Sequence, residues 1–424
     1  MPARHLRLAP VRLCVRSTVT TGRSRGFLSH RFVHIHGGPV TAGCLSAAFP
    51  MHLPERMREV TTPLCWQEWD QCLANHPDRF RQYIVEGIRH RFRIGFDYGS
   101  HTCRRFPCNM LSARERPEII NDYLAQECSE GRVLGPLDPA QFPFVQTSKF
   151  GVIPKGLTGK WRLIVDMSSP EGASVNDGIQ ESLGSLTYVG IEEAANSICA
   201  VGKGALMAKV DVKSAYRNIP VHPDDRWLMG MLWEGALYVD TALPFGLRST
   251  SKIFTAIADA VEWIARQKGV QFIIHYLDDF LVIGALASLE CAQALAVLKS
   301  LYELLGLPVA LAKLVGPVPC LDFLGFELDS EAMEICLPHP KLAELRELIQ
   351  SWLGRKSCTK KELHKERTAI HHWETLTRVA SDTTRQDLYA ANVQATGGHT
   401  SAPPPYTAES ILSLRPPMVG YIHG

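Results

Sequence analysis

Hydrophobic positions along the chain follow two periods, one typical of helices and one typical of strands. Apolar residues recur every three to four positions in residues 117–130, 251–267 and 341–353, as in helices with one buried face. Between residues 148 and 332, short apolar runs of strand type alternate with helical segments, and Gly and Pro separate them. This alternation predicts an α+β fold.

The segments outside this region differ in pattern. From Cys65 to about Gly135 the spacing is helical, and we expect the segment Arg91–Phe96 to be helical with it. Residues 1–54 contain seven Arg and no acidic residue, which is typical of an organelle transit peptide or of a disordered basic arm. After about His364 the apolar periodicity fades, which predicts a disordered tail.

The composition is that of an ordinary globular protein and excludes a mainly disordered, collagenous or coiled-coil chain. With 45 Lys and Arg against 43 Asp and Glu, the net charge of +2 gives no indication of a nucleic-acid partner. Twelve Cys without a Cys-x-x-Cys pair indicate thiols in a reducing compartment, the cytoplasm or nucleus, and the basic leader makes the mitochondrion an alternative. No apolar run reaches the roughly 20 residues of a membrane span, so no membrane partner is expected.

Two aspartates, Asp278 and Asp279, stand between the apolar runs 272–274 and 281–283, which predict the two strands of a hairpin. Two carboxylates about 4 Å apart repel each other by ~4 kcal/mol at an effective dielectric constant near 20. We therefore expect a cation beside them. The alternative is a solvated turn, in which Asp is common.

A third aspartate, Asp211, ends a predicted strand in which successive side chains face opposite sides. On this pattern Met207, Lys209 and Asp211 share one face. Asp211 can join the aspartate pair only if the two strands are neighbours. The alternative role for a lone Asp at a strand end is a helix cap.

A basic stretch lies upstream of these strands. Residues 149–162 hold the four cations Lys149, Lys155, Lys160 and Arg162 and no acid. Cations on a hairpin suit a triphosphate, because Arg can bind two oxygens and Lys acts as a point charge. A solvated basic hairpin is the commoner outcome for such a run.

A sharp turn from strand to helix is predicted at residues 243–249, which read Leu-Pro-Phe-Gly-Leu-Arg-Ser. Here Gly246 allows a ligand or template to approach the backbone closely. An ordinary turn is the alternative.

In this order, the basic hairpin, the strand-end Asp, the Pro-Phe-Gly turn and the Asp-Asp hairpin resemble the reverse transcriptase family. Its members are right-hand polymerases with fingers, palm and thumb. Residues 155–166 and 174–179 look most like the polymerases of LTR-type retroelements, and in particular those of DIRS-type retrotransposons, which encode a tyrosine recombinase. The resemblance spans roughly residues 65–363 and includes the segment Asp322–Phe326.

The resemblance implies a right-hand polymerase that is truncated after a partial thumb, since about 60 residues remain beyond residue 363, too few for an RNase H domain of the usual size. The implied parts are a basic disordered leader (1–60), a helical N-terminal extension (61–145), fingers (146–205), a palm (206–332), a partial thumb or connection (333–364) and a disordered tail (365–424).

The resemblance also implies roles for single residues. The catalytic carboxylates are Asp211, Asp278 and Asp279, which with the carbonyl of Val212 bind two Mg²⁺ or Mn²⁺ ions. The expected nucleotide-binding residues are Lys155, Arg162, Tyr216, Phe245, Gly246 and Lys313. The residues expected at the primer or template are Tyr276, Phe323, Leu324 and Gly325. Lys313 is equally well explained as an exposed lysine at a helix end, and Phe323 and Leu324 as ordinary strand packing.

The implied function is that of an RNA-directed DNA polymerase, which joins dNTPs to a primer 3′-hydroxyl. Its partners are an RNA or DNA template with its primer, dNTPs and other proteins of a retroelement. The alternative is a weak or inactive relic of a retroelement that still binds nucleic acid. An RNA-dependent RNA polymerase is disfavoured, because Tyr216 fills the space that a ribose 2′-hydroxyl needs.

Overall fold

The computed structural model describes residues 13–14, 62–99, 108–155, 160–186, 188 and 190–352. Most of the expected leader (1–60), the end of the expected thumb beyond residue 352 and the expected tail (365–424) lie outside the described residues. The chain divides into two compact units, the first ending at His339 and the second beginning at Pro340. Helices and sheets are mixed along the chain, which confirms the predicted α+β fold.

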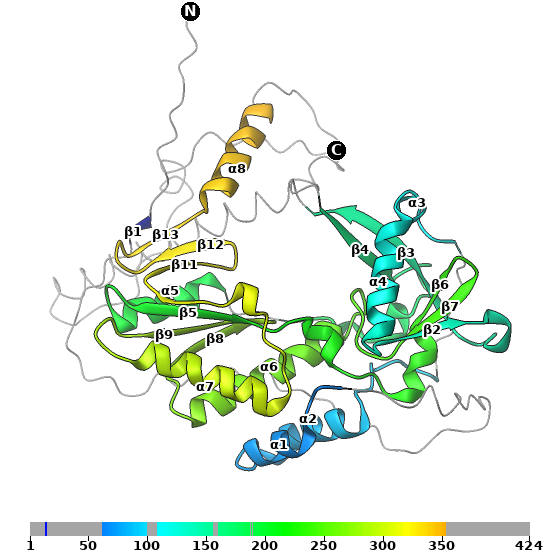
Figure 1. Cartoon of the computed structure of the whole chain (residues 1–424), viewed down its shortest axis with the longest axis horizontal. Coiled ribbons are helices and arrows are strands. Elements are labelled where there is room, and N and C mark those ends of the chain that lie inside the picture. The colour runs from blue at the N-terminus through cyan, green and yellow to red at the C-terminus, as the bar shows by residue number, and fades with distance from the viewer. Residues whose placement is uncertain are drawn as a thin grey trace, which may run out of the picture. The chain divides into compact units, whose positions relative to one another are not determined.

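The central sheet of the first unit is antiparallel and has the strand order β10-β5-β9-β8. Its strands are β5 (Leu206–Asp211), β8 (Phe272–Tyr276), β9 (Asp279–Gly284) and β10 (Val315–Val318). Helices that pack against it are α5 (Ile191–Val201), α6 (Thr250–Gln267) and α7 (Glu290–Leu305) (Figure 1). The strand predicted before Asp211, the apolar hairpin and the helix predicted at 251–267 are all confirmed.

The two faces of this sheet differ in chemistry, because neighbouring side chains of a strand point to opposite sides. Phe280 of β9 is buried and packs edge-on against Tyr302 of α7, with ring centroids 5.7 Å apart. Val210 of β5 pairs with Phe280 and shares this helix-covered face. Asp211 and Asp279, each adjacent in its strand to one of these residues, therefore lie on the opposite face.

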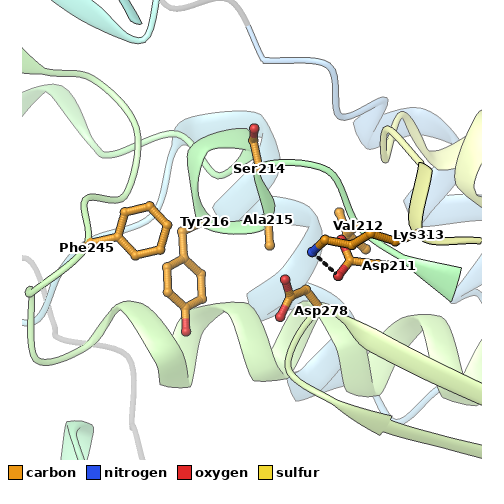
Figure 2. Close-up of a pocket in the computed structure, with 8 residues that line it drawn as sticks. All are labelled: Asp211, Val212, Ser214, Ala215, Tyr216, Phe245, Asp278 and Lys313. Atoms are coloured by element: carbon orange, nitrogen blue, oxygen red, sulfur yellow. Dashed lines mark hydrogen bonds and ion pairs between the residues drawn. The ribbon is translucent and has the colours of Figure 1, made fainter. Parts of the chain in front are cut away.

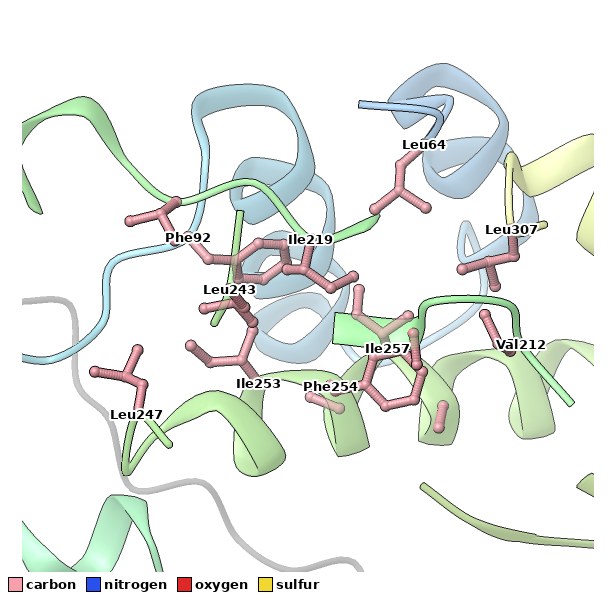
Figure 3. Close-up of a cluster of buried hydrophobic side chains, with 14 of the residues drawn as sticks. Leu64, Phe92, Val212, Ile219, Leu243, Leu247, Ile253, Phe254, Ile257 and Leu307 are labelled. Atoms are coloured by element: carbon pink, nitrogen blue, oxygen red, sulfur yellow. The ribbon is translucent and has the colours of Figure 1, made fainter. Parts of the chain in front are cut away.

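Two N-terminal helices join the core of this sheet. They are α1 (Trp66–Cys72) and α2 (Asp78–His90). The indole N–H of Trp69 donates to the carbonyl oxygen of Leu305, at the end of α7, at 2.9 Å. Leu64 and Phe92, which flank these helices, belong to the same buried cluster as Ile257 of α6 (Figure 3). The N-terminal helices are thus part of the first unit's core.

The prediction that the segment Arg91–Phe96 is helical was wrong. Helix α2 ends directly before it, and Arg91 has a φ of 79°, which no α-helix continues. Phe92, Ile94 and Phe96 are buried while the residues between them are more exposed. Burial that alternates from one residue to the next is typical of an extended segment, which is the conformation of this stretch.

A second sheet has the strand order β2-β7-β6-β3-β4. Its strands are β2 (Val133–Leu137), β3 (Thr147–Pro154), β4 (Trp161–Asp166), β6 (Gly230–Trp233) and β7 (Ala236–Asp240). Helices α3 (Leu111–Arg114) and α4 (Pro117–Ser129) pack on it, and α4 confirms the helix predicted at 117–130. The sheet that holds the basic hairpin β3–β4 thus takes two strands from residues 230–240, inside the range expected for the palm. The division at residues 205–206 stays a prediction.

A third sheet has the order β1-β13-β12-β11. Its strands are β1 (Leu13–Cys14), β11 (Cys320–Phe323), β12 (Phe326–Asp329) and β13 (Glu334–Cys336). The short 3₁₀ helices of the chain are Pro139–Gln141, Asn176–Gly178, Glu181–Leu183, Ala215–Asn218, Pro223–Leu228 and Leu311–Lys313. Helix α8 (His339–Trp352) matches the helix predicted at 341–353. Among the described helices, none has the length and hydrophobicity needed to cross a bilayer.

A buried ion cluster holds the second sheet to the central region. The guanidinium of Arg217 lies 2.8 Å from Oε2 of Glu127 and 2.5 Å from Oδ1 of Asp240. Arg132 approaches the other oxygen of Glu127 at 2.6 Å. Glu127, Arg217 and Asp240 are all buried. The guanidinium groups therefore replace the water that would otherwise stabilise each carboxylate.

We predict that Arg217→Ala lowers the free energy of unfolding by about 3–5 kcal/mol, because two buried carboxylates lose their shared partner. Urea unfolding followed by circular dichroism measures this loss. The matched control is Arg81→Ala, which removes a half-exposed ion pair with Asp70 and should cost at most about 1 kcal/mol. Equal losses in the two variants would contradict the assignment of a structural role to the buried cluster.

Candidate active site

Strand pairing brings the three predicted carboxylates to one end of the central sheet. Asp211, the last residue of β5, pairs directly with Asp279, the first residue of β9. Tyr276 pairs with Asp279 across the hairpin, so Asp278 lies in the two-residue turn between β8 and β9. The backbone N–H of Val212 donates to the carbonyl oxygen of Asp278 at 3.1 Å. The two strands are therefore neighbours, as a shared site for the three acids requires.

A pocket at this end of the sheet contains six of the predicted site residues. Its lining residues are Asp211, Val212, Ser214, Ala215, Tyr216, Phe245, Asp278 and Lys313. Figure 2 shows the two carboxylates and the ammonium group on one side of the pocket and the two aromatic rings on the other. The pocket therefore combines a charged end with an apolar end.

Lys313 supplies the cation that the aspartates were expected to need. Its Nζ lies 2.6 Å from Oδ2 of Asp211 (Figure 2). The Asp211 side chain is 5% exposed, whereas that of Lys313 is 62% exposed. The hydrogen bond to Asp211 raises the pKa of Lys313, which keeps the ammonium charged. The fold holds the carboxylate in place, and the lysine reaches it from the solvent side.

The other two aspartates lie in surroundings that disfavour their ionised form. Burial raises the pKa of Asp278, and Asp211 adds to this rise while Lys313 opposes it. Burial raises the pKa of Asp279 to about 6; Lys209 opposes this rise, and Asp211 and Asp278 reinforce it. The carboxylate end of the pocket therefore favours the binding of positive charge.

The donor atoms at this end suit a hard divalent cation. Asp211, Val212 and Asp278 line the pocket, and carboxylate and carbonyl oxygens are the ligands that Mg²⁺ and Mn²⁺ prefer. The ammonium of Lys313 on Asp211 shows that a positive group is accommodated there. In the part of the chain that the structure describes, no group of three or more His, Cys, Asp or Glu is arranged to hold a metal ion by itself.

The apolar end of the pocket is formed by two rings from distant segments. Tyr216 lies in the 3₁₀ helix after β5, and its hydroxyl oxygen is 3.1 Å from Oγ of Ser251 at the start of α6. The rings of Tyr216 and Phe245 have centroids 5.3 Å apart, and Phe254 packs on Tyr216 from α6 at 5.5 Å. Phe245 is more than half exposed, so it offers a ring surface to a ligand.

The turn beside Phe245 is held by an amide that the sequence reasoning did not single out. Asn176 is buried; its Nδ2 donates to the carbonyl oxygen of Gly246 at 2.8 Å, and its Oδ1 accepts from the N–H of Arg248 at 2.7 Å. Gly246 has a φ of 92°, and a Cβ there would lie 2.3 Å from the carbonyl oxygen of Val165. A turn that requires glycine is therefore clamped from a segment 70 residues away. An Asn within a Ser-Val-Asn-Asp-Gly run gives no local signal for this role.

Comparison with known proteins identifies the region that contains this pocket. Residues 153–328 match the family described as "Reverse transcriptase (RNA-dependent DNA polymerase)". The matched range holds the strand-end Asp211, the Pro-Phe-Gly turn and the Asp-Asp hairpin. Residues 153–328 belong to the reverse transcriptase family.

Relatives of the reverse transcriptase domain occur in viral polyproteins. The Pro-Pol polyprotein of feline foamy virus is 24% identical over 227 residues, which is 52% of this chain and 17% of the relative. The Polyprotein P3 of Commelina yellow mottle virus is 29% identical over 167 residues, or 37% of this chain and 8% of the relative. This chain thus spans less than a fifth of the length of the curated relatives it matches.

A solved structure titled as the foamy viral protease-reverse transcriptase in complex with dsDNA is 17% identical, with a TM-score of 0.45. The match covers 77% of this chain and 73% of that chain. The viral relatives confirm the family, and the narrower resemblance to DIRS-type elements stays a prediction.

The remaining predicted residues of the domain lie outside the pocket lining. Lys155 and Arg162 lie on the β3–β4 hairpin. The ring of Tyr276 packs against Tyr188, with centroids 4.8 Å apart. Phe323 is fully buried, so the structure supports ordinary strand packing for this residue.

The next two predicted residues form a tight turn. Leu324 and Gly325 join β11 to β12 with φ values of 49° and 85°. Neither residue lines the pocket, and the roles of the residues outside it, including Asp279, stay predictions.

We predict that the metal-free domain loses stability as the pH rises through about 6. A carboxyl group whose pKa is higher in the folded protein than in the unfolded chain stabilises the fold when the pH lies below its ordinary pKa. This stabilisation is lost as the pH rises through the folded-state pKa, because the folded protein then carries the charge. Asp279 has its pKa raised in this sense, to about 6. Asp279→Asn should therefore stabilise the metal-free protein by about 1 kcal/mol at pH 8 and change little at about pH 4 or below, after allowance for solvent screening.

Thermal unfolding between pH 4 and 8 in the presence of a chelator measures this effect. Asp122→Asn, which alters an exposed residue of α4, is the control and should keep the pH slope of the unmutated protein. The prediction would be refuted by an Asp279→Asn variant whose stability follows the same pH slope as the control.

Proposed function

We propose that this reverse transcriptase domain is an RNA-directed DNA polymerase that adds dNTPs to a primer 3′-hydroxyl. The observation that supports this most directly is the pocket that joins Asp211 and Asp278 to the rings of Tyr216 and Phe245. An acidic end can receive the reacting phosphate with its cations, and an apolar end can receive the sugar and base. An RNA or DNA template with its primer and dNTPs are the proposed partners.

The proposed mechanism assigns a task to each end of the pocket. Divalent cations, when bound, would activate the primer 3′-hydroxyl and stabilise the leaving pyrophosphate. Asp211, Asp278 and the carbonyl of Val212 would hold them, with Asp279 beside Asp211 keeping the local charge negative. We propose two such ions, Mg²⁺ or Mn²⁺.

Cationic side chains would act on the triphosphate. Lys155 and Arg162 on the basic hairpin would neutralise charge that grows on the phosphate oxygens. Lys313 would leave Asp211 when a divalent cation binds and would then be free to give a proton to the departing pyrophosphate. Its high exposure is consistent with such a movement, since little packing opposes it.

Tyr216 would select the sugar. Its ring is held by Phe254 and its hydroxyl by Ser251, so it cannot turn away from the pocket at low cost. A fixed ring under the sugar would exclude a ribose 2′-hydroxyl, which favours a DNA polymerase over an RNA-dependent RNA polymerase. The intact pocket also favours an enzyme over an inactive relic, because its carboxylates and aromatic rings are all present.

We predict that the protein extends a DNA primer on an RNA template when supplied with dNTPs and Mg²⁺ or Mn²⁺. Asp211→Asn and Asp278→Asn should each lower the extension rate by about 100-fold or more, because each removes a charged ligand from the site. Asp122→Asn serves as the control and should retain the full rate. Binding of primer–template by the unmutated protein without any extension would overturn the proposal and support the relic.

A second prediction concerns the sugar. Tyr216→Ala should raise the incorporation of ribonucleotides relative to deoxynucleotides by about tenfold or more, since it opens the space for a 2′-hydroxyl. Tyr216→Phe keeps the ring, loses only the bond to Ser251 and should remain selective for deoxynucleotides. Single-nucleotide incorporation with each triphosphate measures the ratio. Unchanged selectivity in Tyr216→Ala would remove the role proposed for this ring.

The source of the domain is a separate proposal. We propose a retroelement origin of DIRS type, on the strength of residues 155–166 and 174–179. The location in cytoplasm, nucleus or mitochondrion stays a prediction, as does the division into fingers (146–205), palm (206–332) and partial thumb (333–364).

A further inference from the structure

A second lysine, Lys209, lies on the same strand face as Asp211, two positions earlier in β5. Lys209 pairs with Leu281 across β9, just as Asp211 pairs with Asp279. Its ammonium group donates to the backbone carbonyl oxygen of Asp322 at 2.9 Å. Lys209 therefore links the strand that carries a catalytic acid to a strand of the third sheet.

Asp322 lies next to the hairpin turn of that sheet. It pairs with Glu327, and the following pair, Phe323 with Phe326, closes directly on the two-residue turn Leu324-Gly325. The contact from Lys209 thus reaches β11 one residue before the segment that the family resemblance assigns to the primer. The acceptor is a backbone oxygen, so the contact fixes the position of the strand and not that of a flexible side chain.

The other end of the third sheet is fixed in a different way. The side chain of Ser330, after β12, is fully buried, and its hydroxyl lies 2.6 Å from the carbonyl oxygen of Ala205 and 3.0 Å from that of Pro319. The N–H of Gly204 donates to the carbonyl oxygen of Ser330 at 2.8 Å. A buried anchor thus holds the sheet at the start of β5, and Lys209 holds it toward the end that carries Asp211.

Lys209 also lies close to the acids in the sheet. It stands two residues before Asp211 in β5, and its pairing partner Leu281 stands two residues after Asp279 in β9. Solvent reaches both lysines: the Lys313 side chain is 62% exposed, and the hydrogen bond from half-buried Lys209 to Asp322 is itself exposed. The two lysines differ in their acceptors, which are a carboxylate oxygen for Lys313 and a backbone oxygen of β11 for Lys209.

We infer that Lys209 is a positioning residue that sets the place of the β11–β12 hairpin, and with it the primer end, relative to the carboxylates of the pocket. This inference rests on the proposed polymerase function for the identity of the ligand that the hairpin meets. The hydrogen bond to Asp322 is a property of the protein alone, so it can be tested without catalysis.

The test compares Lys209→Met, which removes the donor and keeps the length, with Lys209→Arg, which keeps a cationic donor. Lys203→Met, at an exposed lysine before β5, is the matched control. Hydrogen–deuterium exchange of residues 320–329 in the nucleic-acid-free protein should be faster by about fivefold in Lys209→Met. Lys209→Arg and the control should stay within about twofold of the unmutated protein.

Binding and turnover give the second readout. Lys209→Met should weaken the binding of a fluorescent RNA–DNA primer–template by about fivefold, and Lys209→Arg should restore it. In primer extension, the KM for primer–template should rise by a similar factor, while the KM for dNTP stays within about twofold. A Lys209→Met variant with unchanged exchange and unchanged primer–template binding would overturn the inference.

If kcat fell in both Lys209 variants while binding and exchange stayed unchanged, the inference would also be overturned. Lys209 would then act on the carboxylates of the pocket and not on the hairpin. If the unmutated protein failed to extend primers, the polymerase proposal would fall. The exchange and binding measurements would still decide the role of Lys209.

Discussion

The pairing of Asp211 with Asp279 is the contact on which the rest of the site depends. It places two carboxylates side by side on one face of an apolar sheet, with Asp278 in the adjoining turn. Neighbouring like charges repel, and the packing of the strands beneath them helps to hold the two carboxylates together. The opposite face provides that hold, through Phe280 and the helices that cover it.

Two lysine side chains lie near these carboxylates and offset their negative charge. Lys313 neutralises Asp211 through a contact that solvent reaches easily, and such a contact is readily exchanged for another cation. Lys209 donates instead to a backbone oxygen of a different sheet, and its charge opposes the rise in the pKa of Asp279. The acidic end of the pocket thus has positive charge beside it within the protein itself.

The aromatic end of the pocket depends on contacts of a different nature. The rings of Tyr216 and Phe245 pack against each other, and their segments are joined by a backbone hydrogen bond from Leu243 to Ile219 at 2.9 Å. The turn at Gly246 is held by Asn176, which lies after the basic hairpin, and Gly246 approaches the backbone of β4. The position of Phe245 in the pocket thus depends on the strand pair that carries Lys155 and Arg162. The acidic end of the pocket is thus built on the central sheet, whereas the turn that carries Phe245 approaches β4 of the second sheet.

The sequence by itself determined the elements whose signal is local. The apolar hairpin around Asp278, the strand ending at Asp211 and the helices at 117–130 and 251–267 follow from periodicity over a few residues. The segment Arg91–Phe96 was misjudged because the helical pattern of α2 was extended past a residue with positive φ, although the alternation of Phe92, Ile94 and Phe96 was visible.

Tertiary structure alone decided which distant segments meet. The contact of Lys313 with Asp211 spans 102 residues, that of Lys209 with Asp322 spans 113, and that of Asn176 with Gly246 spans 70. The strands at 230–240 likewise join the sheet that holds the basic hairpin, about 70 residues earlier in the chain. Such contacts leave no periodic trace in the chain, because a single hydrogen bond or ion pair constrains one residue at each end and nothing between.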